Sequence, residues 1–170
     1  MSEEQFLELV EENEERFHHL CRIYTDRSAE EKDLYQEMLI QVWRAFPSFE
    51  DRASIHTWAY RIALNTAISF VRKKRTRRDY HDRYRREEVS RRGRRQTRPG
   101  DGESPEHVTT LYDAISHLNP SEKAILSMYL EDFSYAEIAY VTDITENHVG
   151  VKLHRIKKKL SKIIEEENGA

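Results

Sequence analysis

The chain has 170 residues, of which 38% are hydrophobic and 35% are charged, a composition that suits one ordinary domain or two small helical ones. Its single cysteine, Cys21, excludes an internal disulfide and is typical of a reducing compartment. The first residues are acidic and amphipathic, so they predict no secretory signal, and no apolar run reaches the length of a bilayer. We therefore expect a soluble, cytoplasmic protein that does not insert into a membrane.

The net charge of -3 conceals a very uneven distribution. Residues 1–71 carry 7 Lys and Arg against 14 Asp and Glu, and residues 99–170 carry 7 against 13. Residues 72–98 carry 14 basic residues against 4 acidic ones. Such a basic block is typical of a protein with a polyanionic partner or of a disordered segment. The acidic flanks argue against a protein that coats nucleic acid indiscriminately.

Three helices are predicted in the N-terminal part of the chain, because apolar residues recur there at helical spacing. Ser2 and Gln5 are spaced as a capping box at the start of the first helix, and Ser28 and Glu31 at the start of the second. A polar loop at residues 48–54 precedes the third helix. The apolar stripes of the second and third helices are Leu34, Tyr35, Met38, Leu39, Val42 and Phe46, followed by Ile55, Trp58, Ala59, Ile62, Ala63, Thr66 and Phe70.

The helical periodicity fails from residue 76 to residue 106, where Arg, Asp, Glu, Ser and Gly dominate. Such a stretch buries too little apolar area to offset the conformational entropy of the chain. We therefore expect an all-α protein with a first domain at residues 1–75, a flexible basic linker at 76–106 and a second domain at 107–170. Tyr80 and Tyr84 lie four residues apart and leave room for one or two further turns of the third helix.

The second domain is expected to end in a helix-turn-helix. Capping boxes precede two of its helices, at Asn119 with Glu122 and at Ser134 with Glu137. Asp143 occupies the turn, where a left-handed backbone is needed and Asp tolerates it better than most residues. The outward positions expected on the last helix are Glu146, Asn147, His148, Lys152 and Arg155.

These outward side chains have the chemistry of base recognition in the major groove of DNA. Asn pairs with adenine, Lys or Arg pairs with guanine, and any cation can hold a phosphate. The alternative is a helical hairpin whose charges are only solvated, since so short a pattern has false positives. Gly150 costs roughly 1 kcal/mol inside a helix, and it would permit a close approach to a DNA backbone.

Two longer motifs resemble a known family. The first is DLYQEMLIQVWRAFPSFEDRASIHTWAYRIALNTAISFVRKKR, and it resembles the second region of bacterial sigma factors. The other is LNPSEKAILSMYLEDFSYAEIAYVTDITENHVGVKLHRIKKKL, and it resembles their fourth region. The extracytoplasmic-function (ECF) group of sigma factors keeps only these two regions. Two motifs in the right order, with a linker between them, are more specific than either alone.

The resemblance implies a transcription initiation factor that binds core RNA polymerase and directs it to promoter DNA, with no enzymatic activity of its own. It implies that the DLYQE helix docks on a coiled coil of the largest polymerase subunit. Asp33, Gln36 and Glu37 share one face of that helix, at i, i+3 and i+4. Without the resemblance, the same residues would be an ordinary acidic surface.

The resemblance also implies that the loop before the third helix, together with that helix, recognises and opens the promoter -10 element. Opening takes a base out of the stack, at a cost of a few kcal/mol. Asn65 offers both a donor and an acceptor and is the expected reader of that base. Trp58 is expected to be a core anchor more than a stacking platform. The basic turn at residues 72–75 would hold phosphates. The candidates on this helix and loop are Arg52, His56, Thr57, Trp58, Arg61, Asn65, Arg72, Lys73, Lys74 and Arg75.

The chain departs from the family pattern at three positions. Ser69 stands where members usually have an acidic residue, Gly150 where a cation is common, and Lys152 where Arg is common. Lys lacks the bidentate fork of Arg, so recognition of the promoter -35 element by the last helix is expected to be weaker or shifted.

Two alternatives stay open. A metal site would draw on His18, His19 and Cys21, but no second ligand pair stands at a matching spacing. A two-domain regulator that works without polymerase would bind a DNA duplex on its own. The expected partners are core RNA polymerase and promoter DNA, with an anti-sigma factor as a further candidate. No cofactor, metal or small-molecule substrate is expected.

Overall fold

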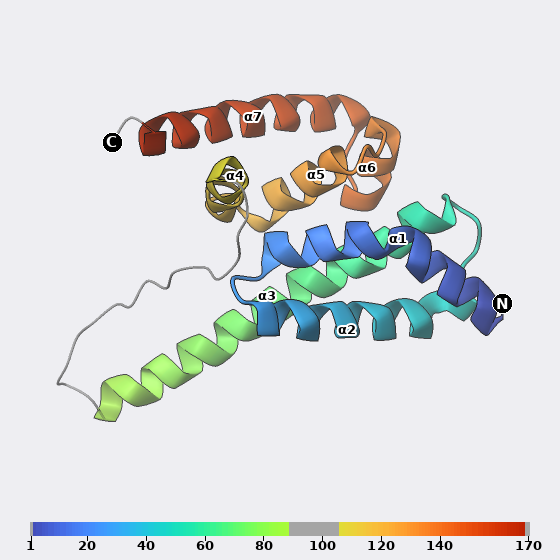
Figure 1. The fold of residues 1–170 in the computed structure, drawn as a ribbon, viewed down its shortest axis with the longest axis horizontal. Helices are drawn as coiled ribbons and strands as arrows, with labels where there is room; N and C mark the ends of the chain where they lie inside the picture. The colour runs from blue at the N-terminus through green and yellow to red at the C-terminus, as the bar shows by residue number, and fades with distance from the viewer. Residues whose placement is uncertain (1, 89–105, 169–170) are drawn as a thin grey trace.

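The computed structural model describes residues 2–88 and 106–168, with side chains for residues 2–76 and 111–166. These residues form seven α-helices and one short 3-10 helix and contain no strand, so the all-α prediction is confirmed. The helices build two domains that lie against each other, α1 to α3 in one and α4 to α7 in the other (Figure 1). None of the described helices is long and apolar enough to cross a bilayer.

The first domain consists of α1 (Glu3–Tyr24), α2 (Ser28–Ala45) and α3 (Ile55–Glu88), with a 3-10 turn, η1 (Phe46–Ser48), after α2. Each helix turns one apolar face inward, and complete burial of a large side chain contributes roughly 1.5–3 kcal/mol. The large, fully buried side chains of this domain are Phe17, Leu20, Leu34, Met38, Val42 and Tyr60.

One predicted helix start is wrong in its details. The capping box of Ser2 and Gln5 at the start of α1 is confirmed. Ser28, however, is already the first residue of α2, and the N-cap residue Arg27 makes no side-chain capping bond. Glu31 turns instead toward α1, where its carboxylate lies 3.7 Å from the guanidinium of Arg22. A contact between helices has therefore replaced the local one.

The helix α3 extends beyond the expected end of the first domain. It continues to Glu88, so residues 76–88, which were expected in the linker, are helical. This segment contains no Gly or Pro, and Arg, its commonest residue, is a good helix former. The remainder of the expected linker, residues 89–105, lies outside the described residues.

The second domain consists of α4 (Glu106–Ser116), α5 (Pro120–Leu130), α6 (Tyr135–Thr142) and α7 (Glu146–Asn168). In Figure 1, α7 lies on the side of this domain that faces away from α1, α2 and α3. The core is closed by apolar side chains from α4, α5, α6 and α7, of which the largest fully buried ones are Ile115, Ile125, Met128, Ile138, Leu153 and Ile156.

The local signals for the helix-turn-helix are confirmed. The capping box of Asn119 and Glu122 starts α5, and that of Ser134 and Glu137 starts α6. Asp143 ends α6 with φ 55° and ψ 44°, in the left-handed region. The turn between α6 and α7 is therefore made by the residue expected to make it.

The two domains contact each other through α4 and α5 on α1 and through α6 on α3. The rings of Tyr60 and Phe133 lie 4.8 Å apart between their centroids, so an aromatic pair joins α3 to the start of the helix-turn-helix. Near it, the carboxylate of Glu131 lies 2.7 Å from Nδ1 of His19. This interface combines an apolar centre with polar pairs at its edge.

Candidate polymerase and nucleic-acid interfaces

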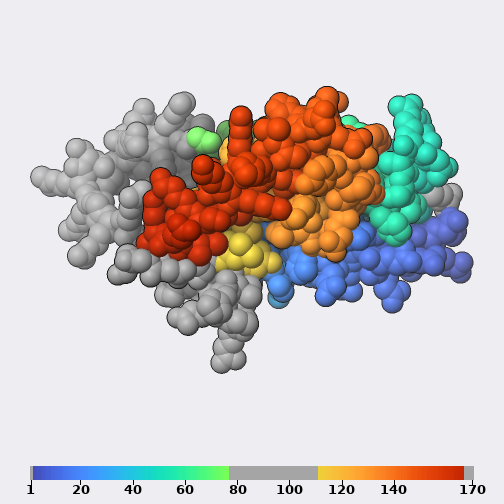
Figure 2. Space-filling view, turned by 90° about the horizontal axis from the view of Figure 1, so that it is seen from above, coloured from blue at the N-terminus to red at the C-terminus, as the bar shows by residue number. Residues whose placement is uncertain are grey.

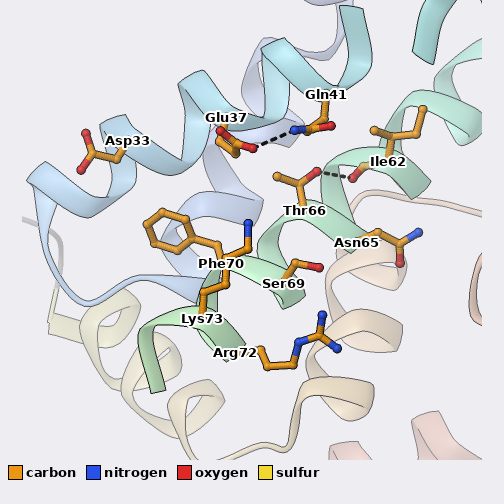
Figure 3. A pocket seen from close by; sticks show the side chains of 10 residues that line it. All are labelled: Asp33, Glu37, Gln41, Ile62, Asn65, Thr66, Ser69, Phe70, Arg72 and Lys73. Carbon is orange, nitrogen blue, oxygen red and sulfur yellow. Dashed lines mark hydrogen bonds between the residues drawn. The ribbon is translucent and has the colours of Figure 1, made fainter. Parts of the chain in front are cut away.

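Two of the three residues expected on the acidic face of α2 are exposed. Asp33 and Gln36 are exposed, and Glu37 is half-buried. Oε1 of Glu37 accepts a hydrogen bond from Nε2 of Gln41 at 2.8 Å (Figure 3). The carboxylate of Glu37 is thus held in place one turn after Asp33 along α2.

Two apolar residues that were not predicted from the sequence as part of a site extend this face. Ile40 and Trp43 are 44% and 47% exposed, although large apolar side chains are usually buried. They lie 7 and 10 residues after Asp33, so they fall on the same side of α2. The Trp43 ring is held in position because it packs edge-to-face on Phe6, with 4.8 Å between the ring centroids. The spacing alone could have identified both residues.

A hollow of about 670 Å³ lies between α2 and α3 (Figure 3). Asp33 and Glu37 line it from α2, whereas Asn65, Arg72 and Lys73 line it from α3. The hollow therefore brings the acidic docking face next to residues expected to contact DNA. Asn65 is exposed, and in Figure 3 its side chain extends from α3 on the side away from Asp33.

A second hollow, of about 330 Å³, opens at the other side of Asn65. Trp58 forms part of its wall and is half-buried, with its ring 5.2 Å from that of Phe49 between centroids. Trp58 is thus both an anchor of the loop before α3 and an aromatic wall beside Asn65. Arg61 also lines this hollow, and its guanidinium lies 5.1 Å from the centroid of the Tyr140 ring in α6.

Thr57 was expected to contact DNA, but in this arrangement of the domains it does not lie on an exposed surface. Its side chain is 0% exposed. Its hydroxyl lies 2.7 Å from Oγ of Ser54 and donates a hydrogen bond to Oε1 of Glu137 at 2.6 Å. The helix-turn-helix domain therefore covers Thr57, which the sequence pattern of either domain alone does not reveal.

His56 is also turned away from the hollow that contains Asn65. Its Nδ1 lies 2.9 Å from Nδ2 of Asn13, and its Nε2 lies 3.6 Å from the carboxylate of Glu12, both on α1. The side chain thus fastens the start of α3 to α1. On the loop before α3, Arg52 is exposed and forms a 2.7 Å ion pair with Glu50.

The basic turn of α3 is only partly free. Lys74 donates a hydrogen bond to Glu30 at 2.6 Å, so this cation is engaged by α2. Arg72, Lys73 and Arg75 are exposed. Three of the four predicted phosphate contacts are therefore presented to solvent.

The last helix presents most of its predicted contacts. Asn147, His148 and Arg155 are exposed, and so is Glu146. The backbone N–H of His148 donates to Oγ1 of Thr145 at 3.3 Å, which fixes the start of α7. Lys152, predicted to point outward, is half-buried on the flank of the helix instead.

The potential metal ligands are directed to separate partners. The His18 ring stacks on that of Tyr35 with 4.4 Å between centroids. Cys21 is buried, and this burial, followed by the charge of Glu31, raises the pKa of its thiol to about 12. Within the described parts of the chain, no group of three His, Cys, Asp or Glu side chains is placed to hold a metal ion.

Known protein families match both domains. Residues 9–78 match Sigma-70 region 2, and residues 109–160 match Sigma-70, region 4. The RNA polymerase sigma factor YlaC of Bacillus subtilis is 30% identical over 146 residues, which cover 80% of each chain. The ECF RNA polymerase sigma factor SigW of the same bacterium is 25% identical over 170 residues, covering 94% of this chain and 89% of SigW. With the ECF sigma factor SigG of Mycobacterium tuberculosis, the match is 35% over 57 residues and covers only 15% of that protein.

Two solved structures share the fold. The sigma factor RpoE, in complex with the anti-sigma factor NepR from Bartonella quintana, aligns with a TM-score of 0.67 and 18% identity over 95% of both chains. CnrH, in complex with the cytosolic domain of CnrY, aligns with a TM-score of 0.66 and 16% identity. That alignment covers 96% of this chain and 90% of CnrH.

Proposed function

The chain belongs to the ECF group of sigma factors, the initiation factors that direct RNA polymerase to promoters, and we propose how its surfaces divide that work. The α2 face binds core polymerase, the exposed part of α3 opens the -10 element, and α7 binds the -35 element. The observation that carries the proposal is the hollow between α2 and α3, which sets the docking face beside Asn65 and the basic turn.

The polymerase-binding surface consists of Asp33, Gln36 and Glu37 together with the exposed Ile40 and Trp43. A mixed surface of this kind suits a protein partner, since carboxylates select a basic surface and buried apolar area supplies affinity. Trp is also among the residues that contribute most when they are buried in an interface. The rigid contact of Trp43 with Phe6 lowers the entropy lost on binding.

The opening surface consists of Asn65 with Trp58 and Arg61 beside it. A base removed from the stack needs an aromatic or apolar wall and a polar reader. Trp58 supplies the wall, and the exposed amide of Asn65 supplies both a donor and an acceptor. Arg72 and Lys73, two turns further along α3, hold the phosphates of the same strand.

The two DNA-binding surfaces differ in how accessible they are while the domains are in contact. The outer face of α7 is exposed, whereas Thr57 lies under Glu137. Thr57 can therefore reach DNA only when the second domain leaves α3. An anti-sigma factor, as in the complexes of the related folds, is a further candidate partner of the chain while its two domains are in contact.

Run-off transcription with purified core polymerase tests the proposal. The full chain added to core enzyme should give promoter-specific transcripts, and core enzyme alone should not. The rival, a two-domain regulator that works without polymerase, predicts specific binding of the same DNA by the free chain. Such binding, together with no transcript from the reconstituted holoenzyme, would reject the proposed function.

A further inference from the structure

The buried side of α7 shows which of its residues point outward. Val149, Leu153 and Ile156 are at most 1% exposed, so they define the side that faces the domain core. An α-helix turns by about 100° per residue. Val151, two residues from both Val149 and Leu153, therefore lies opposite this side. It is 47% exposed.

An apolar side chain at this position is unusual in its surroundings. Asn147 and Arg155, one turn before and one turn after Val151, are exposed and polar, as are His154 and Lys158 on the same side of the helix. In Figure 2, α7 (red) lies on the face of the molecule that is turned toward the viewer. Among the contacts of the described residues, nothing in the chain covers Val151.

Only one base has an apolar group to offer to such a residue in the major groove. The edges of guanine, cytosine and adenine present hydrogen-bond donors and acceptors, whereas thymine adds its C5 methyl. A valine placed against a polar edge would remove water from it without giving a hydrogen bond in return. Against a methyl, the same valine buries apolar area from both partners.

We propose that Val151 contacts the C5 methyl of a thymine in the upstream promoter element and contributes to base preference there. The inference rests on the proposed function, namely that α7 lies in the major groove of that element. It adds a specificity-determining residue that carries no charge and no hydrogen-bonding group. Asn147 and Arg155 then flank a position of the element at which thymine is preferred.

Replacement of thymine by uracil tests this contact, because uracil pairs identically and lacks only the methyl. Holoenzyme is assembled from the full chain and core polymerase, and a preferred upstream element is first selected from randomised DNA. Each thymine of that element is then replaced in turn by deoxyuridine. Wild-type holoenzyme should lose about fourfold in affinity at one position, the value expected for one buried methyl group.

Val151→Ala should bind the thymine and uracil versions of that position equally, and Val151→Thr, which keeps one methyl, should retain part of the difference. Both variants should fold, since the side chain is exposed, and circular dichroism checks this. The inference is overturned if no uracil replacement weakens wild-type binding, or if Val151→Ala keeps the full difference. It is also overturned if Val151→Ala weakens all sequences alike, which would indicate a backbone contact. A holoenzyme with no preference for any upstream sequence would instead reject the proposed function itself.

Discussion

Glu137 of α6 accepts a hydrogen bond from the hydroxyl of Thr57 at 2.6 Å, and this bond joins the helix-turn-helix to the start of α3. The second oxygen of the same carboxylate accepts the backbone N–H of Ser134 at 2.9 Å and so completes the capping box of α6. One side chain therefore serves both the start of its own helix and the contact between the domains. Replacing it in a way that preserves the cap separates these two roles.

Glu137→Gln should weaken the contact between the domains while α6 stays intact. Gln is as suitable as Glu in a capping box, but it replaces a charge-assisted hydrogen bond by a neutral one, at a cost of about 1 kcal/mol. Hydrogen exchange of the backbone amides at the start of α3 should become faster. Glu122→Gln is the matched control, because Glu122 occupies the same position in the capping box of α5. Equal exchange at the start of α3 in the Glu137 and Glu122 variants would contradict the prediction.

The domain contact should weaken at acid pH. Burial alone would raise the pKa of Glu137, but the hydrogen bonds from Thr57 and Ser134 and the charge of Arg16 outweigh it, and the pKa lies below its ordinary value. Thr57 and Arg16 belong to the first domain, so the part of the lowering that they cause stabilises the domain contact above the ordinary Glu pKa of about 4.3. This contribution is lost as the pH falls through the lowered pKa of Glu137. Small-angle X-ray scattering between pH 7 and pH 3 should show expansion. Because Gln does not titrate, Glu137→Gln should expand less than the wild type between pH 7 and pH 3. An identical pH profile in the variant would argue against the role of Glu137.

Local structure was more predictable from the sequence than structure that depends on packing between distant segments. The box of Ser134 and Glu137 and the left-handed Asp143 were predicted correctly, because each depends on a few neighbouring residues. The box of Ser28 and Glu31 failed because Glu31 is drawn to α1. Burial of Thr57 likewise requires knowledge of how the domains meet.

The outward face of α7 is an intermediate case. Lys152 was expected to point outward and Val151 was not assigned a role, although the stripe of inward residues sets the angle of every position on the helix. Lys152 was chosen for the chemistry of its side chain, whereas the helical geometry places Val151 on the outward side. The residue roles on α2 and α3 came from the resemblance, and they stay predictions until variants are measured.

Reversal of charge on α2 should impair holoenzyme assembly. Asp33→Lys combined with Glu37→Lys places two cations where a basic partner surface is expected, and like charges in an interface cost several kcal/mol. Pull-down with core polymerase should show at least a tenfold loss of binding, with helicity unchanged. Glu11→Lys combined with Glu15→Lys is the control, since it makes the same charge change at the same spacing on the exposed side of α1. Loss of binding in the control alone would move the docking surface to α1.

Asn65→Ala should slow promoter opening more than promoter binding. The side chain is exposed and lines both hollows beside α3, so its removal leaves the fold intact. Loss of base-specific hydrogen bonds in the open complex should lower the rate of opening by about tenfold, or ~1.4 kcal/mol. Permanganate reactivity of unpaired thymines measures this rate. Thr76→Ala, on an exposed position of the same helix, should open at the wild-type rate, and normal opening by Asn65→Ala would remove Asn65 from the base readers.

Gly150→Ala should stabilise the second domain. Gly in a helix interior is less favourable than Ala by about 1 kcal/mol, and a β-carbon at this position would meet Cε2 of Tyr135 at 3.5 Å, an ordinary van der Waals distance. The gain should raise the unfolding temperature by a few degrees, as measured by calorimetry. Ser161→Ala, at an exposed position of the same helix, should give a smaller rise because Ser is intrinsically less unfavourable than Gly. An unchanged or lower unfolding temperature for Gly150→Ala would mean that the Tyr135 ring cannot accommodate the methyl. If stability rises while promoter affinity falls, Gly150 is retained because a DNA backbone passes close to it. The glycine then lowers the stability of the helix in exchange for this close approach.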